Sequence, residues 1–208
     1  EHTLLPVGML YNPITKTDFT KEKILQDSNK YTEYNPTEAK KLWKDGIAET
    51  GQTDLSFPLL ADDTDNAKKQ NEFIQGQLEK NLPGLKITLQ NVPFKSRLDK
   101  STSGQFDIVV TGWNADYPDP VTFLDIFTTG NSQNNGKYSN KDYDALIEKS
   151  KTTDAAIEEA RWQDLLETTK ILTVDQVAVP MYQYYQANFT SSNVHHYVIA
   201  PYGSYNLV

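Results

Sequence analysis

The chain has 208 residues, which is long enough to bury a core in one large or two small domains. Its 28 acidic and 20 basic residues give a net charge of −8, so nucleic acid and anionic membrane surfaces are disfavoured and a cationic or zwitterionic partner is favoured. The lack of cysteine excludes disulfides and thiolate chemistry, the lack of a long apolar run excludes a membrane-spanning helix, and 12 tyrosines argue against a disordered chain.

The first half of the chain alternates between helical and strand patterns after an irregular start. Residues 1–34 carry scattered prolines and glycines without a sustained period and predict a connector. Capping and periodicity then predict, in order, a helix at 35–51, a strand at 54–61, a helix at 63–81, a strand at 85–92, a short helix at 93–100 and a strand at 108–110. Pro58 requires the first strand to lie at an edge or to contain a bulge. The alternation predicts an α/β layer with parallel crossovers.

The second half is mainly helical. Its patterns predict a short helix at 121–127, a surface loop at 128–138, a helix capped by 139–142, a longer helix that opens at Asp154, a β-rich stretch at 177–185 and a short strand at 194–199. Within the loop, Asn134-Asn135-Gly136 supplies residues that tolerate positive φ. The two long helices are expected to form a hairpin.

No motif signals catalysis. The sequence lacks a P-loop, a dinucleotide-binding fingerprint, a nucleophile elbow and a zinc-protease motif, so we expect a protein that is not an enzyme and needs no cofactor. The neighbouring His195 and His196 would point to opposite faces of a strand and have no suitably spaced third ligand, so no metal site is expected. The acidic set Asp116, Asp119 and Asp125 could supply paired carboxylates for glycoside hydrolysis, although aspartate in loops usually serves turn geometry.

Residues 107–125 contain the most informative boundary in the chain. An apolar run leads into Gly112 and Trp113, and two prolines then stop the strand, at the kind of position where α/β proteins bind ligands. A carboxylate there, Asp116, needs a cation, which a ligand ammonium can supply, and Trp113 could form a wall of the same pocket. Alternatively, Trp113 is a core residue and Asp116 caps the helix beginning near Pro118. The spacing alone leaves both interpretations open.

Residues 107–120, followed by Phe123-Leu124, resemble the signature of the OppA-like oligopeptide-binding proteins of ABC importers. Further matching pieces follow in the same order, at 134–135, 138–140, 143–147, 161, 165–166 and 179–182, and the resemblance covers about residues 50–190. It implies a type II periplasmic-binding-protein architecture, in which two lobes close on an extended peptide. The resemblance further implies that the chain corresponds to the C-terminal lobe, domain III. Residues 35–208 are therefore expected to be an α/β ligand-binding lobe with a mixed, mostly parallel sheet flanked by helices, excised from a larger receptor.

The same resemblance implies a binding site. The carboxylate of Asp116 would receive the α-ammonium of a peptide, and backbone groups of Gly112, Trp113 and Asn114 would pair with its main chain. The implied partners are an oligopeptide and a membrane ABC permease, and the implied state is a monomer outside the cytoplasm, either lipid-anchored at the cell surface or periplasmic. Receptors for pheromones, dipeptides and nonpeptide solutes share the signature. Two other classes remain as alternatives, namely a carbohydrate hydrolase using Asp116 and Asp119, and a protein-binding signalling or adhesion module.

Overall fold

The computed structural model describes residues 2–185, 187, 189–195, 197–199 and 205–207. Residue contacts divide the chain into two compact units, one formed by 34–112 and the other by 1–33 together with 113–208. Each unit has its own buried hydrophobic cluster, so each is described by itself.

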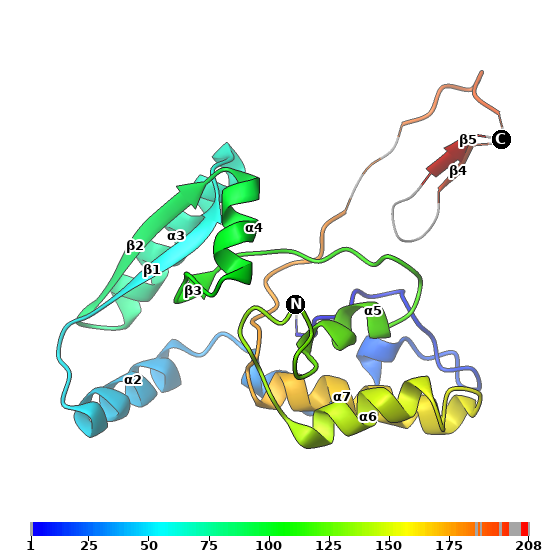
Figure 1. Cartoon of the computed structure of the whole chain (residues 1–208), viewed down its shortest axis with the longest axis horizontal. Helices are drawn as coiled ribbons and strands as arrows, with labels where there is room; N and C mark the ends of the chain where they lie inside the picture. The colour runs from blue at the N-terminus through cyan, green and yellow to red at the C-terminus, as the bar shows by residue number, and fades with distance from the viewer. Residues whose placement is uncertain (1, 186, 188, 196, 200–204, 208) are drawn as a thin grey trace. The chain divides into compact units, whose positions relative to one another are not determined.

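The unit 34–112 is a parallel sheet with helices between its strands (Figure 1). Its elements are α2 (Pro36–Thr50), β1 (Leu55–Asp62), α3 (Asp65–Asn81), β2 (Leu85–Val92), α4 (Phe94–Thr102) and β3 (Ile108–Val109). The strand order is β2-β1-β3, with α3 packed against β1 and β2, and α4 against β1. The predicted alternation of helices and strands is confirmed, as is the α/β expectation.

The helix ends in this unit follow the capping signals of the sequence. The side chain of Asn35 accepts a hydrogen bond from the backbone N–H of Glu38, and Gly51 ends α2 in the left-handed conformation with φ of 67°. Gly84, which precedes β2, also has positive φ, and a Cβ atom there would collide with the carbonyl oxygen of Thr53. Glycine is therefore required at the turn into β2.

Pro58 lies in β1, the central strand, yet it costs the sheet no hydrogen bond. Leu60 accepts a hydrogen bond from Val110 N, so the backbone groups of Leu60 face β3, and those of Pro58, two residues earlier, face the same side. Because β3 pairs only with Leu59 and Leu60, the ladder has not begun at Pro58. The proline thus occupies a local edge within a central strand.

The cluster under this sheet follows the predicted alternation of β2 and only part of the predicted face of α3. Its buried members are Leu59, Ala61, Leu85 and Ile87. The helical spacing of Ala67, Phe73, Ile74 and Leu78 predicts one buried face for α3. Ile74 and Leu78 pack against the cluster accordingly, whereas Phe73 is 67% exposed. Asn71 is fully buried instead, and neither polar atom of its side chain has a partner among the described residues. The prediction for Phe73 is wrong because apolar character at helical spacing does not by itself fix the rotation of a helix.

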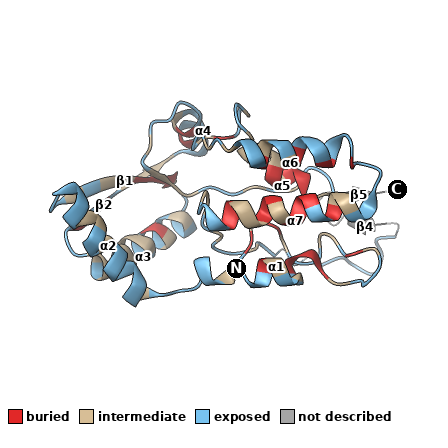
Figure 2. Cartoon of the chain, turned by 90° about the horizontal axis from the view of Figure 1, so that it is seen from below, coloured by how far each residue is buried: buried red, intermediate tan, exposed pale blue. Residues whose placement is uncertain are grey.

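The unit formed by 1–33 and 113–208 is mainly helical. Its elements are η1 (Phe19–Lys21), α1 (Lys23–Gln26), η2 (Asn29–Tyr31), α5 (Val121–Leu124), η3 (Asp125–Phe127), α6 (Lys141–Lys151), α7 (Glu158–Val174), β4 (Tyr197–Ile199) and β5 (Tyr205–Leu207). The helices α6 and α7 pack side by side, as expected for a hairpin (Figure 1), and α7 carries many of the buried residues (Figure 2). The strands β4 and β5 pair in the antiparallel direction.

The first 33 residues contribute to the core of this unit. Leu5, Phe19 and Leu25 are each 1% exposed and belong to the cluster that contains Trp162 and Leu165 of α7. The rings of Phe19 and Trp162 meet edge to face with centroids 5.1 Å apart. Where the sequence predicted an irregular connector, the structure therefore shows short helices and buried side chains. The assignment of 35–208 as one ligand-binding lobe stays a prediction.

Three other expectations differ from the structure. The helix α7 begins at Glu158, because Asp154 lies in the preceding turn, where it pairs with Lys149 at 2.7 Å. The β-rich stretch 177–185 is not assigned to a strand, and Pro180 within it has no N–H for a ladder. In the loop 128–138, positive φ occurs at Gly130 and Lys137 rather than at 134–136.

Asn134 has a different role from the one predicted for it. It is buried, its amide donates to the carbonyl oxygens of Phe127, Thr128 and Tyr138, and its Oδ1 accepts from Tyr138 N. The loop is thus organised around a buried asparagine. The strand expected at 194–199 appears only as 197–199, and His196 lies outside the described residues.

Candidate functional site

The backbone leaves the sheet after β3, and from Gly112 to Asp116 it makes no hydrogen bond to other backbone groups among the described residues. Val110 N donates to Leu60 O at 2.9 Å, and the next backbone donor downstream with a partner in the backbone is Asp119 N, which donates to Tyr117 O. Among the described residues, the N–H and C=O groups of Gly112, Trp113 and Asn114 have no partner. Unpaired backbone beyond the end of a strand can pair with an extended segment added from outside.

Nothing in the described chain requires glycine at position 112. Its φ lies outside the left-handed region, it is exposed, and a Cβ atom there would meet nothing within 4 Å. A glycine that neither the backbone conformation nor internal packing requires is consistent with close approach by another backbone.

Trp113 is half-buried and belongs to neither hydrophobic cluster. Its indole Nε1 is buried and has no hydrogen-bond partner among the described residues. Because buried donors are nearly always paired, this N–H is suited to an acceptor that the chain itself does not supply. The core interpretation of Trp113 is therefore not supported, whereas Asn114 beside it is exposed, as a contact residue would be.

The carboxylate of Asp116 is exposed and has no hydrogen bond or ion pair among the described residues. Its backbone N–H donates to Thr122 Oγ1 at 3.2 Å. The capping role that the sequence left open for Asp116 belongs instead to Asp119, whose Oδ1 accepts from Val121 N at 2.9 Å, at the start of α5. Asp116 is thus held by its backbone while its side chain stays available.

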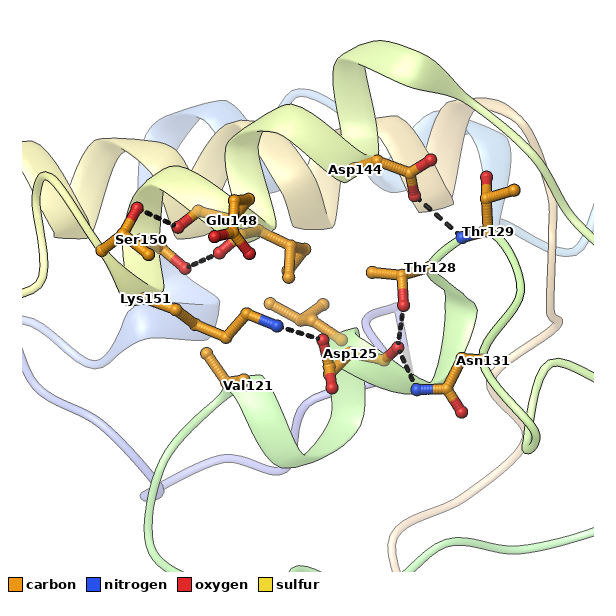
Figure 3. Close-up of polar contacts among 12 residues, drawn as sticks. Val121, Asp125, Thr128, Thr129, Asn131, Asp144, Glu148, Ser150 and Lys151 are labelled. Carbon is orange, nitrogen blue, oxygen red and sulfur yellow. Dashed lines mark hydrogen bonds and ion pairs between the residues drawn. The ribbon is translucent and has the colours of Figure 1, made fainter.

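The other two carboxylates of the acidic set are already paired. Both oxygens of Asp119 accept from Nη2 of Arg161, at 2.9 and 2.7 Å. Asp125 accepts from Lys151 Nζ at 2.8 Å, as Figure 3 shows. A hydrolase needs two carboxylates that can reach the substrate, and a guanidinium holds Asp119. The arrangement therefore does not favour the hydrolase that would use Asp116 and Asp119.

The electrostatics of the loop favour a cation. Partial burial raises the pKa of Tyr117, and the carboxylates of Asp119, Asp125 and Asp116 raise it further, while Lys151 opposes them. Among the charges that act on this pKa, Asp119 and Asp125 each have a larger effect than Lys151, so the carboxylates of the loop outweigh that cation at the phenol. A positive group arriving beside Asp116 would enter a favourable field.

All four predicted site residues therefore lie on one continuous stretch, but no contact in the described chain assigns their roles. Gly112 closes the unit 34–112, and Trp113 opens the segment of the other unit. Sequence reasoning did not identify Thr122 as the acceptor for Asp116 N and named Arg161 only as part of the resemblance. The signal for Arg161 was weak, because one basic residue in a helix has no spacing that points to a loop 42 residues away.

Comparison with known proteins places this chain in a family. Residues 2–135 match the family described as "Bacterial extracellular solute-binding proteins, family 5 Middle". The chain belongs to this family. It is 40% identical over 164 residues to the dipeptide-binding protein of Lactococcus lactis subsp. cremoris, an alignment that covers 76% of the chain and 30% of that relative.

Solved structures agree with the sequence match. The Listeria monocytogenes OppA bound to peptide is 41% identical, with a TM-score of 0.73 over 85% of this chain and 32% of that one. The pheromone receptor PrgZ, whose solved structure describes its mode of peptide binding, is 33% identical, with a TM-score of 0.81 over 99% of this chain and 38% of that one. The chain thus spans about a third of their length. The predicted family resemblance and fold class, a lobe of the type II periplasmic-binding-protein kind, are confirmed.

No helix in the described part of the chain has both the length and the apolar character needed to cross a membrane.

Proposed function

We propose that this chain is one lobe of an extracytoplasmic receptor that captures oligopeptides and delivers them to an ABC permease. The proposal is carried by one observation, namely which carboxylates and backbone groups of the loop after β3 have no partner within the described chain. Asp116 alone of the three loop aspartates lacks a cation among the described residues, and it lies two residues beyond the unpaired backbone of Gly112, Trp113 and Asn114. The peptide-binding names of the relatives support the same ligand class.

The chemistry fits the amino-terminal end of a peptide in extended conformation. The α-ammonium would form a charge-assisted pair with the Asp116 carboxylate, which fixes the register of the peptide. The backbone of Gly112 to Asn114 would pair with the peptide main chain, and such hydrogen bonds do not depend on the peptide's side chains. The receptor would act as a monomer without catalysis or cofactor, either lipid-anchored or periplasmic.

The role of Asp116 is tested in the complete receptor by changing Asp116→Asn. The variant keeps the shape of the side chain and removes its charge, so free peptides should lose about 10- to 100-fold in affinity, whereas N-acetylated peptides should lose little. Isothermal titration calorimetry with matched free and acetylated peptides measures both. Asp45→Asn, at an exposed position of α2, makes the same change of charge far along the chain and should leave both affinities unaltered. Equal losses for free and acetylated peptides would contradict the role given to Asp116.

A second test uses the 208-residue chain alone. Because it spans about a third of its relatives, most of the surface that would enclose a peptide is expected to lie outside it. The chain should therefore bind peptide at least about a hundredfold more weakly than the complete receptor. Affinity equal to that of the complete receptor would show that one lobe suffices.

A further inference from the structure

Arg161 is the residue that ties the Asp116 loop to the helical hairpin. Its Nη2 donates to both oxygens of Asp119, at 2.9 and 2.7 Å, and its Nε donates to the carbonyl oxygen of Ser150 at 3.1 Å. Arg161 lies near the start of α7, Ser150 near the end of α6, and Asp119 two residues before α5. One guanidinium therefore fixes three segments, with the planar geometry that suits a carboxylate.

The connection continues from Asp119 to Asp116 through hydrogen bonds. Asp119 Oδ1 also accepts from Val121 N at 2.9 Å, which holds the start of α5. Within α5, Thr122 is 4% exposed and its Oγ1 accepts from Asp116 N at 3.2 Å. The position of the Asp116 backbone thus depends on α5, and the position of α5 depends on Arg161.

Arg161 also decides which carboxylate of the loop is free. Asp119 lies three residues from Asp116, and without a cation it would compete for the ammonium group at a position out of register with the backbone of Gly112 to Asn114. With Arg161 on both of its oxygens, Asp119 is neutralised and an arriving ammonium has a single partner.

We propose that Arg161 is a positioning residue for the ammonium site, which acts through Asp119 and Thr122 to hold Asp116 and to make it the one free carboxylate of the loop. This inference rests on the proposed function of Asp116. It concerns specificity, because misplacing Asp116 would weaken recognition of the peptide's free amino terminus more than recognition of its main chain.

The measured quantity is a ratio, namely the Kd of an N-acetylated peptide divided by the Kd of the same peptide with a free amino terminus, in the complete receptor. Arg161→Met should lower this ratio by about tenfold, since residues in one hydrogen-bond network couple at that scale. The matched control is Lys151→Met, which also removes a cation from a loop aspartate, Asp125. No hydrogen bond among the described residues links Asp125 to Asp116, so the control should change the ratio less than about twofold.

Two further variants separate positioning from folding. Thr122→Val is nearly isosteric and removes the hydrogen bond from Asp116 N to Thr122 Oγ1. It should therefore lower the ratio even if Arg161→Met fails to fold. Arg161→Lys keeps the positive charge but cannot grip the carboxylate and the Ser150 carbonyl in the same planar geometry, so it should restore part of the ratio. Thermal unfolding of each variant shows whether the fold is retained.

The outcomes distinguish this inference from the proposed function. If Asp116→Asn abolishes the preference for the free amino terminus while folded Arg161→Met and Thr122→Val leave it intact, the positioning role is overturned and the function stands. If Arg161→Met and Lys151→Met lower the ratio equally, the effect is general charge and the positioning role is again overturned. If Asp116→Asn leaves the preference unaltered, the proposed function itself fails.

Discussion

The two units of the molecule differ in how far apart along the sequence the residues of their cores lie. In the unit 34–112, the core comes from neighbouring strands and the helix that joins them, because β1 and β2 pair along their whole length and α3 connects them. In the other unit, Leu5, Phe19 and Leu25 share a core with Trp162 and Leu165 of α7. The first unit can form from local contacts, whereas the second requires the beginning of the chain to find a helix far downstream.

The units also differ in how they accommodate their buried charges. Arg97 in the unit 34–112 is 5% exposed, and it donates to Asp62 Oδ1 at 3.0 Å and to Thr111 Oγ1 at 3.1 Å. Asp164 in the other unit is also 5% exposed, but only its Oδ1 has a partner, Lys149, and its Oδ2 has none among the described residues. One buried charge is well satisfied and the other is not. Three predictions test the contrast between the cores and the contrast between the buried charges.

The largest effect is expected from Phe19→Ala, which tests whether the N-terminal segment belongs to the core. Removing a fully buried ring that packs on Trp162 should lower the free energy of unfolding by about 3 to 5 kcal/mol. Urea unfolding measures the loss, and hydrogen exchange should show α7 losing protection more than β1 and β2. Ile14→Ala changes a residue of the same segment that is 77% exposed, and should cost less than about 0.5 kcal/mol. Equally small losses for both variants would mean that residues 1–33 are a connector after all.

A smaller effect is expected from Arg97→Met in the unit 34–112. The change keeps the apolar length of the side chain but leaves Asp62, the last residue of β1, and Thr111, two residues beyond β3, without their shared donor. Because Asp62 is 30% exposed and water can partly replace the guanidinium, we expect a loss of about 2 kcal/mol. Lys86→Met removes a cation that is 77% exposed from a pair 3.8 Å long, and should cost under about 0.5 kcal/mol. If Arg97→Met and Lys86→Met lowered the free energy of unfolding by similar amounts, the buried Arg97 would have no distinct role.

The same contrast explains which parts of the fold were predictable from the sequence. In the unit 34–112, the helix ends are set by interactions within a few residues, at Asn35, Thr64 and Gly51. The alternation of β2 likewise indicates a strand with one face more buried than the other. In the other unit, the burial of Phe19 depends on Trp162, and no local pattern signals a contact over that separation. The start of α7 was misplaced for the same reason, since Asp154 serves an ion pair with Lys149 rather than a helix cap.

The candidate site was predictable in part. The sequence located the stretch 112–116 because strand ends, prolines and a carboxylate coincide there, and the family resemblance supplied the proposed roles. The sequence singled out Asp116 for a ligand ammonium but held no sign that Asp119 is already paired, because that pairing comes from Arg161, which reaches the loop only in the folded chain. Pairing of charges is a tertiary property, whereas turn chemistry is a local one.

The smallest effect concerns the unsatisfied charge of Asp164 and its dependence on pH. Burial raises the pKa of Asp164, Lys149 on α6 opposes the rise, and Asp154 in the turn before α7 adds to it. The folded chain therefore holds this proton more tightly than the unfolded chain, for which the ordinary pKa is 3.8. As the pH rises through the window above 3.8, the unfolded state releases the proton first, so Asp164 makes the fold less stable.

The variant Asp164→Asn cannot ionise and should escape this loss. Its stability relative to the native chain should rise between about pH 4 and pH 7, by less than about 1 kcal/mol, because Lys149 already offsets part of the cost. Urea unfolding at several pH values measures the difference, and Asp45→Asn controls for the general loss of one carboxylate. A relative stability that falls as the pH rises would show that the ion pair with Lys149 outweighs the burial of Asp164. Asp164 in the second unit would then be as well satisfied by its partners as Arg97 is in the first unit.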